Sequence, residues 1–375
     1  MSLTGWALPT LLILLALVLV VPIVLGLPTN RGLKPALVRA GQLTGFTILV
    51  LTLTGVILNN QEKFFATWSD LGQYVFETTP DSETSSHGGV APSRSPEPAS
   101  PSVQPIPALP PLPSSDKIQA FTVTGGKSGL TGKITVVLPD NYNPKAATGY
   151  PVLVAFMGYP GDERQWLASS TMNLPQTLAQ AVAAKKIADP IVVIPQITFE
   201  GLDSECVNGP SGRPQVGTWL SQDVIDWTID HLRVGPVKTH WATTGFSAGG
   251  YCSAYIGLHD PHRFGAAQIL GGYFKPLFSG GYRPLTDAQL TTPEYDLTQL
   301  VQTQPPAMAV WVQSARGDGL SHPSSAAFLK AVKAPTAATE VTLEGGGHTY
   351  RVWRASLAES FEWLAATLPG FAAAH

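Results

Sequence analysis

The 375-residue sequence has only two cysteines and few charged residues. Cys206 and Cys252 lie far apart in the chain, and no cysteine–histidine spacing resembles a metal site. Charged residues make up 13% of the chain and the net charge is −3 at pH 7, so the composition indicates no basic surface for nucleic acid. We therefore expect a protein that uses no metal and no cofactor and does not bind nucleic acid.

The first 60 residues also contain very little charge. Two apolar runs, at about 6–27 and 38–58, are each long enough to cross a bilayer. The loop between them carries Arg31, Lys34 and Arg39, whereas no charged residue precedes the first run, so the positive-inside rule places this loop in the cytoplasm. A cleaved signal peptide is the alternative for the first run, but a basic N-terminal region is missing and the run is long for one. We predict a two-helix transmembrane hairpin over residues 1–60, with everything after Asn59 extracytoplasmic.

Two further segments separate this hairpin from the globular part. Residues 61–77 are aromatic and amphipathic, and they are expected either to lie at the membrane interface or to pack on the second span. Residues 78–115 are rich in proline, serine and alanine, a composition that cannot bury a core. We interpret 78–115 as a disordered linker that holds the following domain away from the membrane.

Residues 116–375 show the alternation of strands and helices typical of an α/β domain. The predicted strands are 119–124, 132–138, 152–156, 191–195, 239–244, 265–270, 309–313 and 340–343. The predicted helices are 174–185, 218–232, 248–258, 323–332 and 350–367. Short apolar strands between amphipathic helices indicate a mostly parallel sheet covered on both faces, and the first two strands suggest an antiparallel start. This is the pattern of an α/β-hydrolase.

The sequence Gly245-Phe246-Ser247-Ala248-Gly249 has the form of a nucleophile elbow. A β-prone run precedes it and a helix-compatible run follows it, which is the strand–turn–helix context that the motif requires. The turn would present the Ser247 hydroxyl outward, and the N–H of Ala248 at the start of the helix is placed to stabilise an oxyanion. A small-residue turn without chemistry is the alternative interpretation.

A serine nucleophile needs a base and an orienting acid, which α/β-hydrolases supply in the chain order nucleophile, acid, base. Asp318 is the candidate acid, because it follows the apolar strand 309–313 at the edge where α/β catalytic groups gather. Glu344 and Asp296 are its rivals, and a structural turn aspartate is the alternative.

The candidate base is His348, which follows the last strand in a glycine-rich loop before the final helix. His322 is its rival because it lies close to Asp318 in the sequence. A second oxyanion donor is expected from the loop 156–163 after the third strand, where we assign the N–H of Tyr159. Pro160 has no N–H, and an ordinary Pro-Gly turn is the alternative interpretation of this loop.

These residues resemble the putative-esterase family of α/β-hydrolases, which includes esterase D-like enzymes and the secreted mycolyltransferases of the antigen 85 type. The similarity covers about residues 123–368 and rests on five segments: 157–159, 218–220, 245–250, 346–348 and Trp353. The resemblance implies Ser247 as nucleophile, His348 as base and the N–H groups of Tyr159 and Ala248 as oxyanion hole. We expect the protein to be bacterial and to lie in the cell envelope. Mycolyltransferases use a glutamate as the acid, so Asp318 is more similar to the esterases.

On such a fold, Cys206 and Cys252 would both lie near the rim of the active site. An oxidising compartment makes a disulfide between them plausible, and two buried thiols are the alternative. The segment 271–306 shows little periodicity and contains several aromatic residues, so we expect a cap that shapes an acyl pocket.

Two hypotheses follow for the function. The first is an extracytoplasmic, membrane-anchored serine esterase or acyltransferase that acts on a lipid or cell-envelope ester through an acyl-enzyme. The second is a non-catalytic protein that keeps the fold and binds an envelope glycolipid or a protein. Hydrogen bonds from Ser247 to His348 and from His348 to Asp318 would distinguish the two.

Overall fold

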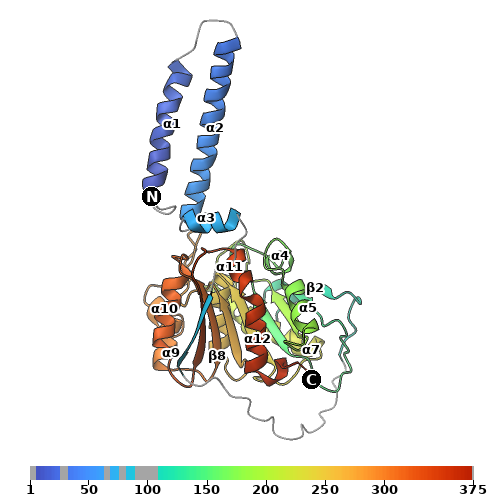
Figure 1. Ribbon diagram of the computed structural model, residues 1–375. Helices are drawn as coiled ribbons and strands as arrows, with labels where there is room; N and C mark the ends of the chain where they lie inside the picture. The colour runs from blue at the N-terminus through green and yellow to red at the C-terminus, as the bar shows by residue number, and fades with distance from the viewer. Residues whose placement is uncertain (1–5, 26–32, 63–67, 76–81, 89–108, 374–375) are drawn as a thin grey trace.

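A computed structural model describes residues 6–25, 33–62, 68–75, 82–88 and 109–373 (Figure 1). Nine strands in these residues form one sheet in the order β1-β9-β8-β7-β6-β4-β5-β3-β2. The strands are β1 Ser82–Gly88, β2 Ile118–Thr124, β3 Thr131–Val137, β4 Val152–Phe156, β5 Ile191–Pro195, β6 Trp241–Phe246, β7 Ala266–Leu270, β8 Ala309–Ala315 and β9 Ala337–Leu343.

The centre of the sheet is parallel and its two edges are antiparallel. Strands β4 to β9 pair in parallel, whereas β2, β3 and β1 pair antiparallel with their neighbours. Every residue of β4, β5, β6, β7 and β8 is buried, because helices cover both faces and the strands can be apolar throughout. The expectation of an α/β fold with an antiparallel start is confirmed.

The helices of the α/β body alternate with these strands. They are α4 Arg164–Leu167, α5 Leu174–Ala183, α6 Val216–Thr218, α7 Val224–His231, α8 Ala248–His259, α9 Leu297–Thr303, α10 Ser321–Ala331, α11 Tyr350–Ala355 and α12 Leu357–Thr367. A π-helical turn, Trp219–Asp223, joins α6 to α7, so the predicted helix 218–232 forms with an irregular start. The predicted helix 350–367 is two helices, because the chain leaves the helical conformation at Ser356.

One prediction for the linker is wrong. Residues 78–115 were expected to be disordered throughout, but 82–88 form β1, which pairs with β9 along its full length from Ser82–Leu343 to Gly88–Ala337. The physical reason is that β9 would otherwise be an open edge, and the backbone of a polar segment satisfies that edge as well as an apolar one does. The linker residues on either side of β1, 78–81 and 89–108, lie outside the described residues.

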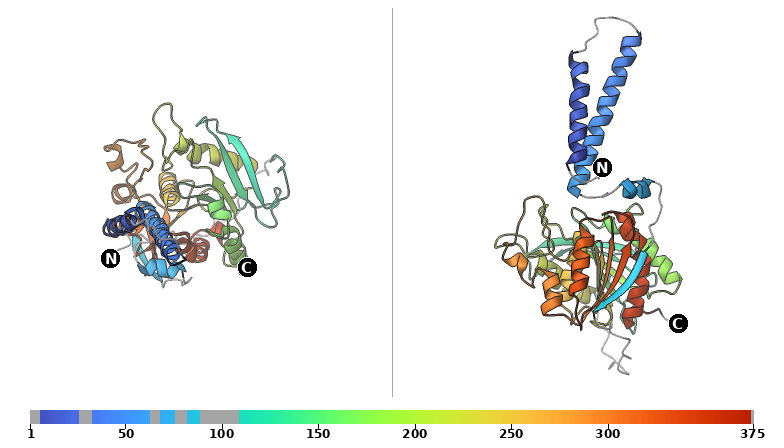
Figure 2. Two further views of the ribbon diagram at one scale, coloured as in Figure 1. Left: turned by 90° about the horizontal axis from the view of Figure 1, so that it is seen from above. Right: turned by 60° about the vertical axis from the view of Figure 1, so that its left-hand side comes forward.

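The N-terminal helices extend away from the sheet (Figure 1). Helix α1 covers Ala7–Leu25, α2 covers Leu33–Glu62, and α1 lies alongside α2. Within the described residues one segment, Leu37–Asn59 in α2, is long and apolar enough to cross a membrane, and the apolar part of α1, Ala7–Val21, is shorter. A short helix, α3 Trp68–Val75, lies between α2 and the α/β body in both the front and the rotated view (Figures 1 and 2).

Candidate active site

The turn between β6 and α8 has the geometry of a nucleophile elbow. Ser247 has φ 55° and ψ −126°, a strained conformation for a residue with a side chain, and it is followed at once by α8. The two flanking glycines are required by close backbone approach. A Cβ at Gly245 would collide with the carbonyl oxygen of Gly249, and a Cβ at Gly249 would collide with that of Phe156. The half-buried Ser247 is therefore held above the carboxyl end of the sheet.

The structure brings Ser247, His348 and Asp318 together. The Oγ of Ser247 lies 2.7 Å from Nε2 of His348, and Nδ1 of His348 lies 2.8 Å from Oδ2 of Asp318. An ionised carboxylate can only accept, so Nδ1 carries the proton and Nε2 is left to accept the hydrogen bond from the serine hydroxyl. The side chains come from the ends of β6, β8 and β9, which lie at the same edge of the sheet.

Asp318 is buried and well supplied with hydrogen bonds. It is 1% exposed, and it accepts bonds from the backbone N–H groups of Leu320 and Ser321 at 2.9 and 3.0 Å and from the Ser321 hydroxyl at 2.6 Å. Burial raises the pKa of Asp318, but the attraction of His348 and the bonds from His348 and Ser321 outweigh it, so the pKa lies below its ordinary value. The carboxylate thus stays ionised at neutral pH.

The rival residues have other partners. Glu344 is exposed and pairs with Arg316, whose Nε lies 2.7 Å from the Glu344 carboxylate. Asp296 accepts the N–H groups of Thr298 and Gln299 at the start of α9. His322 contacts the Ser314 hydroxyl through Nδ1 at 3.0 Å.

An aromatic residue fixes the orientation of the histidine ring. Trp353 of α11 meets His348 edge-on at 4.8 Å between ring centres and stacks on Phe246 at 5.1 Å. Gly271, with φ 54°, makes room for it, since a Cβ there would collide with the indole nitrogen of Trp353. Sequence reasoning noticed Trp353 only through the family resemblance, and it missed Ser321, whose signal was its position three residues after Asp318.

The predicted oxyanion donors, Ala248 and Tyr159, belong to segments that adjoin the serine. Ala248 is the first residue of α8, so its N–H has no partner inside the helix. Gly158 precedes Tyr159 and lies directly against the elbow, because a Cβ at this glycine would be 3.5 Å from the Cβ of Ser247. The Tyr159 hydroxyl donates to the carbonyl of Gly201 at 2.9 Å, which anchors the loop after β4 to the loop after β5.

The disulfide is present between Cys206 and Cys252, with their Cα atoms 5.5 Å apart. It joins the loop after β5 to the elbow helix α8 one turn beyond Ser247. Both residues are buried. The expectation of a disulfide between these two cysteines is confirmed.

The same loop is tied to the segment after β7, which the sequence suggested as a cap. Asp203 accepts the N–H and hydroxyl of Ser279 at 2.9 and 2.8 Å, and Glu205 is hydrogen-bonded to the Tyr273 hydroxyl. Burial, reinforced by the neighbouring Asp203, raises the pKa of Glu205 well above its ordinary value. These contacts were not foreseen, because they join segments about 70 residues apart.

Comparison with known proteins agrees with this geometry. Residues 129–364, well over half of the chain, match the family described as putative esterase. The chain belongs to the putative esterase family. An uncharacterized protein of Corynebacterium glutamicum is 28% identical over 243 residues, and the chain covers 55% of the length of that relative.

Solved structures with the same fold include esterases. A ferulic acid esterase is 18% identical with a TM-score of 0.55, over 66% of this chain and 97% of its own. An S-formylglutathione hydrolase from Agrobacterium tumefaciens is 14% identical with a TM-score of 0.55, over 67% of this chain and 95% of its own. A fluorophosphonate-binding serine hydrolase of Staphylococcus aureus is 16% identical with a TM-score of 0.52, over 66% and 97%. The chain therefore has the α/β fold of these enzymes.

Among the described residues no group of three or more His, Cys, Asp and Glu side chains could hold a metal ion.

Proposed function

We propose that the protein is a membrane-anchored serine esterase or acyltransferase that acts on a carboxylic ester through an acyl-enzyme. The observation that carries the proposal is the continuous pair of hydrogen bonds from Ser247 through His348 to Asp318. Membership of the putative esterase family supports the same conclusion.

In this proposal Ser247 attacks the ester carbonyl while Nε2 of His348 takes its proton. The N–H groups of Tyr159 and Ala248 stabilise the oxyanion of the tetrahedral intermediate. His348 then returns the proton to the leaving alcohol, and an acyl-serine remains. Asp318 holds the ring in the required tautomer and stabilises the imidazolium. Hydrolysis and acyl transfer share this intermediate and differ in whether water or an alcohol resolves it.

The compartment follows from two independent features. The disulfide Cys206–Cys252 favours an oxidising environment for the α/β body. The basic loop between the two apolar runs supports a cytoplasmic position for that loop, with the chain after Asn59 on the opposite side of the membrane. We propose that α1 and α2 span the membrane as a hairpin and that the catalytic body is extracytoplasmic in a bacterial cell envelope.

The test is labelling of the detergent-solubilised full-length chain with a fluorophosphonate probe, which reacts with an activated serine. We expect labelling of the native chain, none of Ser247→Ala and strongly reduced labelling of His348→Ala. A folded chain that resists the probe, or equal labelling of all three proteins, would remove the support for catalysis. Addition of an alcohol acceptor to the esterase assay then separates hydrolysis from transfer.

A further inference from the structure

Strand β1 connects the membrane segment to a particular end of the sheet. It runs antiparallel to β9, so its first residue, Ser82, pairs with the last residue of β9, Leu343, and its last residue, Gly88, pairs with Ala337. His348 follows Leu343 by five residues, and Ala315, which precedes Asp318, pairs with Leu343 from the other side. The chain coming from the membrane therefore enters the body at the edge that holds Ser247, His348 and Asp318.

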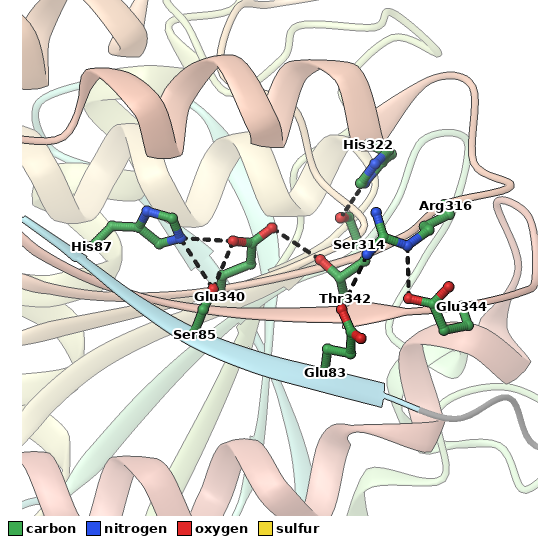
Figure 3. Close-up of polar contacts among 9 residues, drawn as sticks. All are labelled: Glu83, Ser85, His87, Ser314, Arg316, His322, Glu340, Thr342 and Glu344. Carbon is green, nitrogen blue, oxygen red and sulfur yellow. Dashed lines mark hydrogen bonds and ion pairs between the residues drawn. The ribbon is translucent and has the colours of Figure 1, made fainter.

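Side-chain contacts fasten this strand along its length (Figure 3). At the catalytic end, Arg316 contacts Glu83 at 3.1 Å and Glu344 at 2.7 Å. Further along, Glu340 of β9 accepts hydrogen bonds from His87 at 2.7 Å and from Ser85 at 2.9 Å. These pairs add to the backbone ladder and specify the register, because a shift by one residue would turn every pair to the wrong face.

The connection between α3 and β1 is short. Six residues separate Val75, the end of α3, from Ser82, so these two residues lie at most about 25 Å apart. Trp68 and Val75 of α3 are 54% and 61% exposed, and an exposed tryptophan on a short helix close to a membrane span is typical of the bilayer interface. With α3 at the membrane surface, the Ser82 end of β1 is held near that surface.

The opposite orientation is disfavoured by length. Strand β1 is seven residues long and extends about 20 Å from its catalytic end to its far end. Turning the catalytic edge away from the bilayer would place about 20 Å of strand, and the loops beyond it, between the membrane and Ser82. The connection can span at most about 25 Å, so it would have to be almost fully extended along the side of the body. Figure 1 and the right panel of Figure 2 show α3 beside the edge that carries α4 and α11.

We infer that the pairing of β1 with β9 holds the active-site edge of the catalytic body toward the membrane. We infer also that the substrate is an ester carried by a lipid of that membrane. This inference rests on the proposed function and names its substrate class. The sequence suggested that 78–115 holds the domain away from the membrane. With β1 paired to β9, this segment instead keeps the body close to the membrane. The acyl ester reaches Ser247 from the bilayer surface.

The orientation can be measured in the full-length protein. Both native cysteines are in the disulfide, so an introduced cysteine is the one free thiol for a fluorophore. Ser170→Cys places it on the exposed loop after α4 at the catalytic edge, and Ala307→Cys places it before β8 at the opposite edge. In phosphatidylcholine vesicles with a nitroxide quencher on the lipid headgroup, we expect stronger quenching at position 170 than at 307. Equal or reversed quenching would overturn the inference.

A second measurement disrupts the pairing of β1 with β9. Successive amides of an edge strand alternate in direction, so Ser85→Pro/Ser86→Pro removes a ladder bond whichever of the two faces β9. Ser85→Ala/Ser86→Ala is the matched control that keeps the ladder. We expect the proline variant to equalise the quenching at positions 170 and 307 and to lower hydrolysis of methylumbelliferyl oleate in the vesicles about tenfold, as the effective concentration of the ester falls. Hydrolysis of soluble para-nitrophenyl acetate should stay unchanged.

Different results would contradict the proposed catalytic function and the proposed membrane-facing orientation. Loss of both activities to the same extent in the proline variant would contradict the orienting role of β1, and so would retention of both. Fluorophosphonate labelling of the vesicle-bound native chain is the internal reference. Labelled Ser247 with symmetric quenching refutes the membrane-facing orientation alone, whereas absent labelling refutes catalysis itself.

Discussion

Two sets of hydrogen-bonded serine, histidine and carboxylate side chains can be compared among the described residues, and their difference explains why we assign catalysis to one of them. One set is Ser247, His348 and Asp318, and the other, on β1 and β9, is Ser85, His87 and Glu340. In the first, serine and carboxylate contact different nitrogens of the ring, at 2.7 and 2.8 Å. In the second, both face the same nitrogen, Nε2 of His87, at 3.2 and 2.7 Å.

Burial separates the two sets further. The side chains of His348 and Asp318 are 7% and 1% exposed, whereas those of His87 and Glu340 are 32% and 21% exposed. The Ser85 hydroxyl donates directly to Glu340, and the ring nitrogen that faces it, Nε2 of His87, donates to the same carboxylate and so cannot take the serine proton. Residue types alone therefore do not define a catalytic set. Activation of a serine requires that it and the carboxylate contact opposite nitrogens of the histidine ring, and that the group is buried from water.

The largest expected effect comes from removing the two serines separately. Ser247→Ala should lower kcat/KM for a soluble ester by at least about 1,000-fold, because the nucleophile is lost. Ser85→Ala should leave kcat/KM unchanged, since its hydroxyl contacts only Glu340 and His87, at the outer edge of the sheet. Initial-rate assays on the two purified proteins test the comparison, and a similar loss in both would contradict it.

Replacing the two carboxylates gives the next contrast. Asp318→Asn keeps the shape but turns an acceptor into a donor toward Nδ1, which disfavours the tautomer that can accept from Ser247. We expect a loss in kcat of roughly 1,000- to 10,000-fold. Glu340→Gln should retain the native kcat on a soluble ester. If Asp318→Asn kept more than a tenth of the native kcat, the assignment of the acid would be wrong.

The two regions also differ in how they are fastened. The rim beside Ser247 is held covalently by Cys206–Cys252, which closes a loop across a sequence separation of 46 residues, whereas β1 is held by hydrogen bonds and ion pairs. Removing the bridge with Cys206→Ala/Cys252→Ala should lower the free energy of unfolding by about 4 kcal/mol, from loop-closure entropy. Urea unfolding of the solubilised protein measures this. The native chain under reducing conditions should match the variant, and an unchanged midpoint would contradict the bracing role.

The catalytic set could be predicted from the sequence because its signals are local. A glycine-flanked serine between a strand and a helix specifies the elbow, and the ends of parallel strands meet at one edge, so Asp318 and His348 could be placed without coordinates. The boundaries of β4 and β5 were also predicted to the residue, since buried parallel strands are continuous apolar runs.

Strand β1 could not be predicted, because its reasons are not local. Residues 82–88 are polar, with no apolar alternation, and nearly all are exposed. Their pairing depends on β9, about 250 residues away, and on partners such as Arg316 and Glu340. The bonds from Glu205 to Tyr273 and from Asp203 to Ser279 were missed for the same reason. Sequence patterns report which residues suit an element, and they say little about which open edge a polar segment will cover.

The smallest expected effect is the release of β1 by acid. Burial raises the pKa of Glu340, but the hydrogen bonds from His87, Ser85 and Thr342 outweigh it, so its pKa in the folded protein lies below its ordinary value. The contribution of Glu340 to β1 pairing is therefore complete above about pH 4.3 and is lost as the pH falls through the lowered value. Hydrogen exchange of residues 82–88, corrected for intrinsic rates, should become faster below that pH. Glu340→Gln should show fast exchange at neutral pH and little further change on acidification, whereas the same pH dependence in both proteins would place the acid-sensitive contact elsewhere.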